Sequence, residues 1–139
     1  MGHTFNRAVA VCSKFINPKQ LSVMHMLCNG EDGAWFKAKF IELAGLFSTM
    51  PATYSQEEVA DPIVYMHFFL GGADWWITER DSPDPKNENP DEQNQAFGLA
   101  DLFGDGGELG YISIVELMSV GAELDLHWTP CPLSSVNHN

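Results

Sequence analysis

Residues 62–80 read PIVYMHFFLGGADWWITER and carry the strongest fold signal in the chain. Residues 63–70 form an apolar run, rich in β-branched and aromatic side chains, that is too short for a typical helix. Residues 74–80 form a second run of the same kind, and Gly71 and Gly72 between them supply the positive φ values of a tight turn. The stretch therefore predicts a β-hairpin.

Both faces of this hairpin are largely apolar. On the first strand, one face carries Val64, Met66, Phe68 and Leu70, and the other carries Ile63, Tyr65, His67 and Phe69. On the second strand, Trp75 and Ile77 alternate with Trp76 and Thr78. We expect the hairpin to be central in a sheet and covered by other elements, with Phe68 and Trp75 in the core.

The first 47 residues predict a helical N-terminal part with three helices. The apolar residues recur at helical spacing in three sets, namely Phe5, Val9, Cys12 and Ile16, then Leu21, Met24, Leu27 and Cys28, and then Phe36, Phe40, Leu43 and Phe47. In the first of these stretches, 4–16, Val9 and Val11 would also suit a strand. The second helix has the clearest start, because Asn17 can cap it, Pro18 fits the first position and Gln20 completes an arrangement like a capping box.

The rest of the chain predicts further strands and one short helix. Residues 81–95 contain no apolar side chain except three prolines and predict a solvated, mobile loop. Strands are expected at 96–103, 109–112 and 124–128, and Ser113 with Glu116 forms a capping box for a short helix that ends near Gly121. The sequence predicts one α+β domain over 1–139, with an antiparallel sheet of four or five strands.

Composition places the chain among globular proteins. Its 139 residues are 45% hydrophobic and 12% aromatic, and no stretch approaches the ~20 apolar residues of a membrane span. The start of the chain does not resemble a signal peptide. Three cysteines, Cys12, Cys28 and Cys131, lack metal or redox spacing and suggest free thiols in a reducing cytoplasm.

Charge is the global anomaly. The formal net charge is −12, which exceeds the magnitude of roughly 2–8 suited to a small soluble domain. Residues 1–40 carry five basic side chains against two acidic ones, whereas residues 41–139 carry two basic against seventeen acidic. Solubility is one explanation, and a surface that engages a cationic partner is the other. So few basic residues disfavour direct binding of DNA or RNA.

Candidate chemical sites are weak. His67, Glu79, Asp101 and His127 could approach one another on the sheet, where such a cluster could bind metal or move protons. Their spacing matches no zinc signature, and we expect neither a catalytic site nor a metal or cofactor. Residues 101–106 resemble the start of a calcium loop, but Ile112 stands where that loop needs a glutamate. Cys131 is expected to be structural.

Four stretches together resemble a family of small bacterial proteins called domain of unknown function 2958. They are PATYSQEEVADPIVYMHFF, WWITERD, FGLADL with ELGYISIVEL, and LDLHWTPCPLSSV, within the sheet part at 48–136. The resemblance implies cargo of plasmids, integrative elements and phages, without established catalytic residues. The N-terminal helices and the long polar loop depart from the family pattern.

Mobile elements survive host nucleases by encoding small acidic inhibitors, so charge and resemblance favour an anti-CRISPR or anti-restriction protein in the bacterial cytoplasm. Its expected partner is a Cas or restriction complex with a basic surface. The alternatives are a small enzyme that uses the His/carboxylate cluster, or an accessory protein of plasmid maintenance. The acids expected to bind the partner lie on turns and on the exposed connector expected at 48–61, at Glu57, Glu58, Asp61, Asp105 and Glu108.

Overall fold

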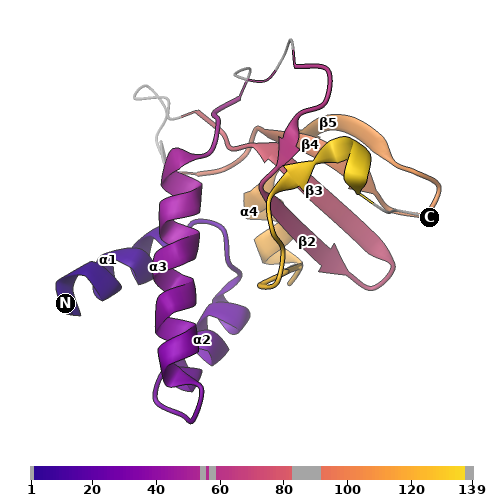
Figure 1. Ribbon diagram of the computed structural model, residues 1–139. Coiled ribbons are helices and arrows are strands. Elements are labelled where there is room, and N and C mark those ends of the chain that lie inside the picture. Colours follow the sequence, from indigo (N-terminus) through magenta and orange to yellow (C-terminus); the bar gives the residue numbers. More distant parts are fainter. Residues whose placement is uncertain (1, 54–55, 57–58, 83–91, 137–139) are drawn as a thin grey trace.

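The computed structural model describes residues 2–53, 56, 59–82 and 92–136, and it has the predicted α+β class. Three helices precede an antiparallel sheet, and a fourth, short helix follows the last long strand (Figure 1). The elements are α1 (Gly2–Cys12), α2 (Pro18–Leu27), α3 (Gly33–Thr49), β1 (Ile63–Val64), β2 (Met66–Leu70), β3 (Ala73–Glu79), β4 (Ala96–Asp101), β5 (Glu108–Ile112), α4 (Ile114–Ser119), β6 (Glu123–Leu124), β7 (Cys131–Pro132) and the 3₁₀ turn η1 (Leu133–Ser135). Among the described residues, none of the helices has the length and apolar character that crossing a bilayer requires.

Helix α2 begins as predicted and is tied to the sheet by its first turn. The side chain of Asn17 accepts a hydrogen bond from the Gln20 N–H at 2.8 Å, which caps the helix. The Gln20 side chain does not close a capping box. Its amide instead donates to the Leu124 carbonyl and accepts from the Leu124 N–H, both at 2.8 Å. Gln20 thus satisfies backbone groups at the sheet edge that strand β6 would otherwise leave unpaired.

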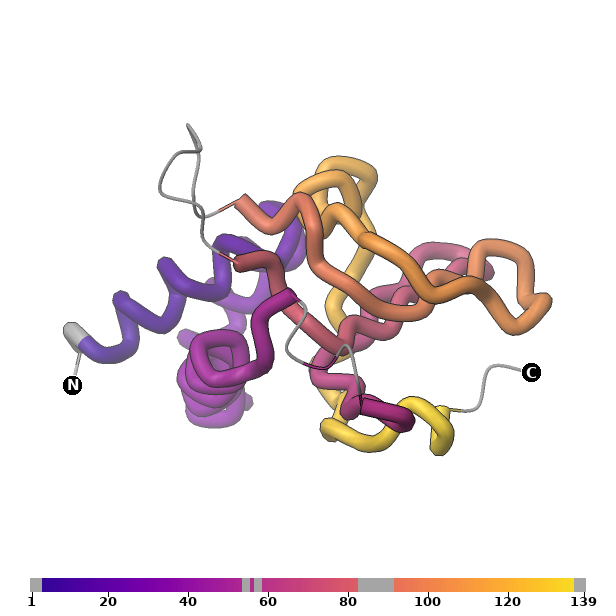
Figure 2. Tube along the Cα trace, turned by 90° about the horizontal axis from the view of Figure 1, so that it is seen from above, coloured from indigo at the N-terminus to yellow at the C-terminus, as the bar shows by residue number. Residues whose placement is uncertain are grey.

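The main core lies between the helices and one face of the sheet. Seen from above, α1 and α3 lie side by side at one side of the molecule, and the strands lie at the other (Figure 2). Phe15 stacks on Phe47 with ring centroids 4.7 Å apart, and Phe40 and Phe68 are fully buried. The predicted helical stripes are therefore largely confirmed. Leu27 is the exception, because it is 38% exposed.

The five-stranded sheet has the order β5-β4-β3-β2-β6, which places β3 at its centre. Gly71 lies in the turn between β2 and β3 with a φ of 58°. This turn pairs Leu70 with Ala73, and the register then pairs His67 with Trp76. The predicted hairpin and its central place are confirmed.

The first predicted strand is divided at Tyr65, and this changes the face on which Val64 lies. Strand β1 pairs with β7, whereas β2 pairs with β3. Val64 consequently joins Trp76 in a second, smaller core and does not share a face with Met66. Trp75 packs against the main core as expected but is only half-buried, whereas the fully buried tryptophan is Trp76, at 4% exposed in the second core.

The strand expected at 124–128 is short. Strand β6 ends at Leu124, because the Asp125 carboxylate accepts a hydrogen bond from the His127 N–H at 3.0 Å and turns the chain. The alternation of Leu124, Leu126 and Trp128 in the sequence therefore does not reflect a continuous strand.

The polar stretch 81–95 is packed at one end. Its residues 83–91, and with them the predicted mobility, lie outside the described residues. Gln93 is 3% exposed, its side-chain oxygen accepts from the Asp81 N–H at 2.7 Å, and its carbonyl accepts from the Ile114 N–H at 2.7 Å. The expectation of a solvated loop is wrong at Gln93, whose buried amide oxygen satisfies a backbone N–H that an apolar side chain would leave unpaired.

Candidate functional site

The face of the sheet opposite the main core is crossed by residues 125–136, which we call the C-terminal segment and whose last part is drawn in yellow in Figure 1. The second core holds this segment in place through Val64, Trp76, Leu99 and Val136. Between the sheet and the segment lies an open cavity of about 450 Å³, which we call the front cavity. Its wall includes His67, Asp74, Trp76, Asp101, Trp128 and Cys131.

His67 on β2 connects three elements at the front cavity. Its Nε2 lies 2.7 Å from Asp74 Oδ1 on β3, and its Nδ1 lies 3.1 Å from Asp125 Oδ2 in the C-terminal segment. The imidazole stacks on the Trp76 ring at 5.3 Å, with 10° between the planes, and lies 5.4 Å from the Trp128 ring. A neutral imidazole carries one N–H, so only the imidazolium can donate to both carboxylates at once.

Asp101 at the end of β4 holds the β4–β5 turn together. Its Oδ1 accepts from the N–H groups of Phe103, Gly104 and Asp105, and its Oδ2 accepts from the Gly106 N–H, at 2.7 to 3.3 Å. Burial raises the pKa of the Asp101 carboxyl, but the four N–H groups outweigh this effect and hold the pKa below its ordinary value. Both oxygens face N–H donors, so Asp101 has a structural role in the turn and not that of a calcium ligand.

We expect Asp101→Asn to lower the melting temperature by several degrees at pH 7. Because the folded-state pKa is depressed, the ionised carboxylate stabilises the fold fully above the ordinary pKa of 3.8, and this contribution is lost as the pH falls below it. The difference between the wild type and the variant should therefore shrink between pH 5 and pH 3 in thermal melts followed by circular dichroism. A difference that stays constant over this range, or one equalled by the exposed-site control Glu108→Gln, would contradict the role given to Asp101.

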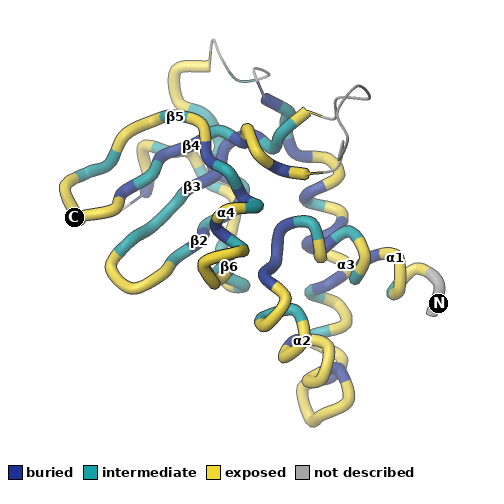
Figure 3. The backbone as a smooth tube through the Cα atoms, turned by 180° about the vertical axis from the view of Figure 1, so that it is seen from behind, coloured by how far each residue is buried: buried dark blue, intermediate teal, exposed yellow. Residues whose placement is uncertain are grey.

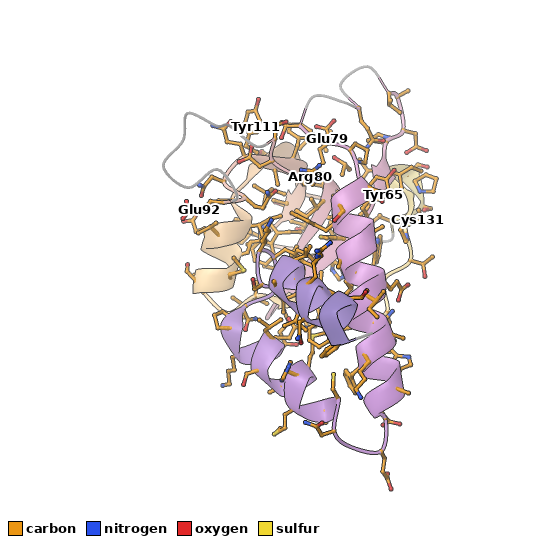
Figure 4. The ribbon with its side chains drawn as sticks, turned by 90° about the vertical axis from the view of Figure 1, so that its left-hand side faces the viewer. Tyr65, Glu79, Arg80, Glu92, Tyr111 and Cys131 are labelled. Atoms are coloured by element: carbon orange, nitrogen blue, oxygen red, sulfur yellow. The ribbon has the colours of Figure 1, made fainter. Side chains whose placement is uncertain are left out.

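The predicted cluster of His67, Glu79, Asp101 and His127 does not assemble. His67 and Asp101 line the same cavity, but Glu79 lies five residues beyond Asp74 on β3, about 17 Å away at ~3.4 Å per residue. Glu79 is 4% exposed there and accepts a hydrogen bond from the Gln56 N–H. In Figure 4 it lies beside Arg80 and apart from Cys131, which lines the cavity.

His127 is also outside the cavity. Its ring lies 5.6 Å from the Trp35 ring of α3. The carboxylates that do meet His67 are Asp74 and Asp125, which the sequence reasoning missed. A signal for Asp74 was present, because a two-residue turn at Gly71 and Gly72 fixes the register and places Asp74 on the His67 face.

The three cysteines are free thiols, as predicted. Burial raises the pKa of the Cys12 thiol to about 12, so this group stays protonated and unreactive. Cys131 is half-buried at the front cavity. In the part of the chain that the structure describes, no group of three His, Cys, Asp or Glu side chains is placed to hold a metal ion.

Of the five acids expected to bind a partner, Glu57 and Glu58 lie outside the described residues. Asp61 is exposed but engaged, since it accepts hydrogen bonds from the Ser134 hydroxyl at 2.6 Å and the Ser134 N–H at 2.9 Å. The hydroxyl first, and then the N–H, hold the pKa of Asp61 below its ordinary value against the opposing effect of burial. Asp61 thus anchors the C-terminal segment.

Asp105 and Glu108 are exposed at the end of the β4–β5 hairpin, beside apolar side chains that are unusually open to solvent. Phe103 is 85% exposed, Leu109 56% and Tyr111 55%. These five residues border a hollow of about 360 Å³, and we call them the hairpin patch. Strand β5 is an edge strand, and the tube is largely exposed along it and the adjoining turn (Figure 3).

Comparison with known proteins identifies the family but no function. Residues 42–129 match the family model described as "Protein of unknown function (DUF2958)". Neither the curated proteins nor the solved structures contain a match. The matched region begins within α3 and includes the whole five-stranded sheet, whereas α1 and α2 precede it. Since it covers more than half of the residues, the chain belongs to the DUF2958 family of proteins of unknown function.

Proposed function

We propose that the protein is a non-enzymatic acidic binding protein, active in the cytoplasm of a bacterial host, that inhibits a defence complex by occupying one of its basic surfaces. The observation that carries the proposal is the hairpin patch. Its exposed aromatic side chain Phe103 and the half-exposed Leu109 and Tyr111 are flanked by the carboxylates of Asp105 and Glu108.

Exposed apolar groups gathered at one place mark interaction surfaces, and aromatic residues often supply most of the binding energy. The acidic flank selects the partner. Carboxylates steer a cationic surface toward the patch and penalise an anionic one, such as nucleic acid. The net charge of −12 extends this preference to the whole molecule.

CRISPR and restriction complexes hold nucleic acid with rows of lysine and arginine, and this is the partner surface that the patch fits. A protein that binds to these basic residues in place of DNA or RNA acts as a nucleic-acid mimic. An occupant of a neighbouring basic site would instead block recruitment of a nuclease.

The direct test measures cleavage of labelled DNA by a panel of purified CRISPR effector complexes and restriction endonucleases, with and without the protein. We expect stoichiometric inhibition of at least one complex, and loss of that inhibition when Phe103 is replaced by alanine. Competition with the target DNA separates the two modes, because a mimic excludes DNA whereas a recruitment blocker leaves DNA bound and uncut. Inhibition that Phe103→Ala leaves unchanged would place the contact elsewhere, and no inhibition across the panel would count against the proposal.

A further inference from the structure

We propose that a second copy of this chain docks its hairpin patch on helix α2, so that copies of the chain associate head to tail. The receiving surface, which we call the α2 face, consists of the exposed residues on one side of α2, namely Lys19, Val23, Met26 and Leu27. The contact uses the hairpin patch but does not rest on the inhibitory function proposed above.

The α2 face is apolar where a helix that faces solvent is ordinarily polar. Val23 is 45% exposed, Met26 65% and Leu27 38%, whereas Met24 is the buried residue of the helix. Large apolar residues thus lie on both the buried and the exposed side of α2, a distribution that is typical of a helix covered on every side. We therefore expect another protein surface to cover the exposed side.

A hollow of about 420 Å³ beside the α2 face can receive an aromatic ring. Its lining consists of Val9 on α1 and of Pro18, Leu21, Ser22, His25 and Met26 on α2. The hairpin patch offers such a ring, because Phe103 is 85% exposed at the β4–β5 turn. Burying a phenyl ring removes a large apolar area from water, and the thioether of Met26 makes favourable contacts with an aromatic ring.

Charge favours the hairpin patch of a second copy as the occupant. Residues 2–30 contain no aspartate or glutamate, so the α2 face carries the charge of Lys19 without a carboxylate beside it on α1 or α2. The hairpin patch carries Asp105 and Glu108 next to Phe103. A head-to-tail contact brings the lysine and the carboxylates together, whereas two α2 faces or two hairpin patches would meet with like charges.

The two surfaces lie at opposite ends of the molecule. In Figure 1 and in Figure 3, α2 lies at the lower end, and the turn between β4 and β5 lies at the edge of the sheet away from the helices. One copy therefore cannot make the contact with itself, and contacts between different surfaces of two copies generate rings or open chains. Because the net charge of −12 opposes association at long range, we expect a weak contact, with a dissociation constant of roughly 0.1 mM.

Sedimentation equilibrium of the purified chain tests for the contact. The weight-average mass should rise above that of the monomer between roughly 10 µM and 1 mM, the range that brackets the expected dissociation constant. Phe103→Ala removes the inserted ring and Met26→Glu places a carboxylate opposite those of the hairpin patch, so each should weaken association roughly tenfold or more. The control Leu70→Glu adds the same charge at an exposed apolar site at the end of β2 and should change little.

A mixing experiment determines the orientation. Phe103→Ala keeps its α2 face and Met26→Glu keeps its hairpin patch, so a mixture of the two should form pairs and no larger species, although neither variant associates alone. A contact between two α2 faces would instead survive in Phe103→Ala, and one between two hairpin patches would survive in Met26→Glu. Circular dichroism shows whether each variant is folded, and Ser22→Glu, at an exposed residue that lines the same hollow, provides a second variant of the α2 face.

The proposal is overturned if the wild-type chain stays monomeric throughout the range, if Phe103→Ala or Met26→Glu alone associates with wild-type strength, or if their mixture does not pair. Equal weakening by Leu70→Glu and Met26→Glu would mean that only the net charge matters, which would also contradict the contact. None of these results would affect the inhibition proposed for the hairpin patch, because the sedimentation experiment contains no defence complex. Absence of inhibition in the cleavage panel would likewise leave the head-to-tail contact in place.

Discussion

Replacing both Asp105 and Glu108 with lysine should slow association with the inhibited complex by roughly tenfold to a hundredfold in low salt. The two side chains are exposed beside Phe103, so reversal turns an attractive field at the patch into a repulsive one. Wild-type association should also weaken steeply with salt, since exposed charges are screened over about 10 Å at 0.1 M. Surface plasmon resonance at several salt concentrations measures both effects.

The chain offers a matched control for this experiment. Glu31 and Asp32 are exposed in the turn between α2 and α3, and reversing both changes the net charge by the same amount. If local complementarity matters, this control should keep most of the association rate. Equal slowing by both pairs would reduce the acidic surface to a general field. Insensitivity to salt and to both reversals would make the contact apolar and the charge a solubility feature.

The structure also changes which acids are suitable probes. Asp61 accepts two hydrogen bonds from Ser134, so a lysine there would loosen the C-terminal segment as well as reverse a charge. Among the described residues, Asp105 accepts a single hydrogen bond, from the exposed Gly107 N–H, so a loss of binding after its replacement reports on charge. Sequence alone ranked these acids equally, because hydrogen bonds between segments 73 residues apart leave no local pattern.

Local sequence signals predicted the elements correctly where the interaction that fixes each element is also local. Asn17 caps α2, and the Ser113 hydroxyl accepts from the Glu116 N–H at the start of α4. They failed where a distant partner decides. Gln20 binds Leu124 and not its own helix, and Val64 leaves the face of Met66 because β1 pairs with β7.

At the candidate site, too, local contacts could be predicted from the sequence and contacts with distant segments could not. Asp74 lies within the hairpin, so the turn register could have identified it as a neighbour of His67. Asp125 is 58 residues from His67 and comes close only because the C-terminal segment folds back over the sheet. No periodic pattern in the sequence predicts that the C-terminal segment folds back over the sheet. Glu79 and His127 were expected at the site only because their residue types suit it, and neither lies there.

Gly98→Ala should produce the largest loss of stability of any single methyl group added to the sheet. Gly98 lies on β4 opposite Ile77, and a Cβ built there would lie 2.0 Å from the Trp76 carbonyl oxygen and 2.9 Å from its carbon. Both atoms belong to the backbone of the central strand and cannot rotate away as a side chain could. Overpacking typically costs about 1–3 kcal/mol, and we expect the upper end or more because β3 itself must move.

Gly110 provides the control, because it is the cross-strand partner of Gly98 on β5 and a Cβ there would meet nothing within 4 Å. Gly110→Ala should therefore be neutral or stabilise by up to about 1 kcal/mol, through the lower entropy of the unfolded chain. Urea unfolding of the two variants measures the contrast. Similar free energies of unfolding for both variants would mean that Gly98 on β4 does not lie as close to the Trp76 carbonyl on β3 as the structure shows. The second core would then be in doubt too, since the same approach places Leu99 against Trp76, which lines the front cavity.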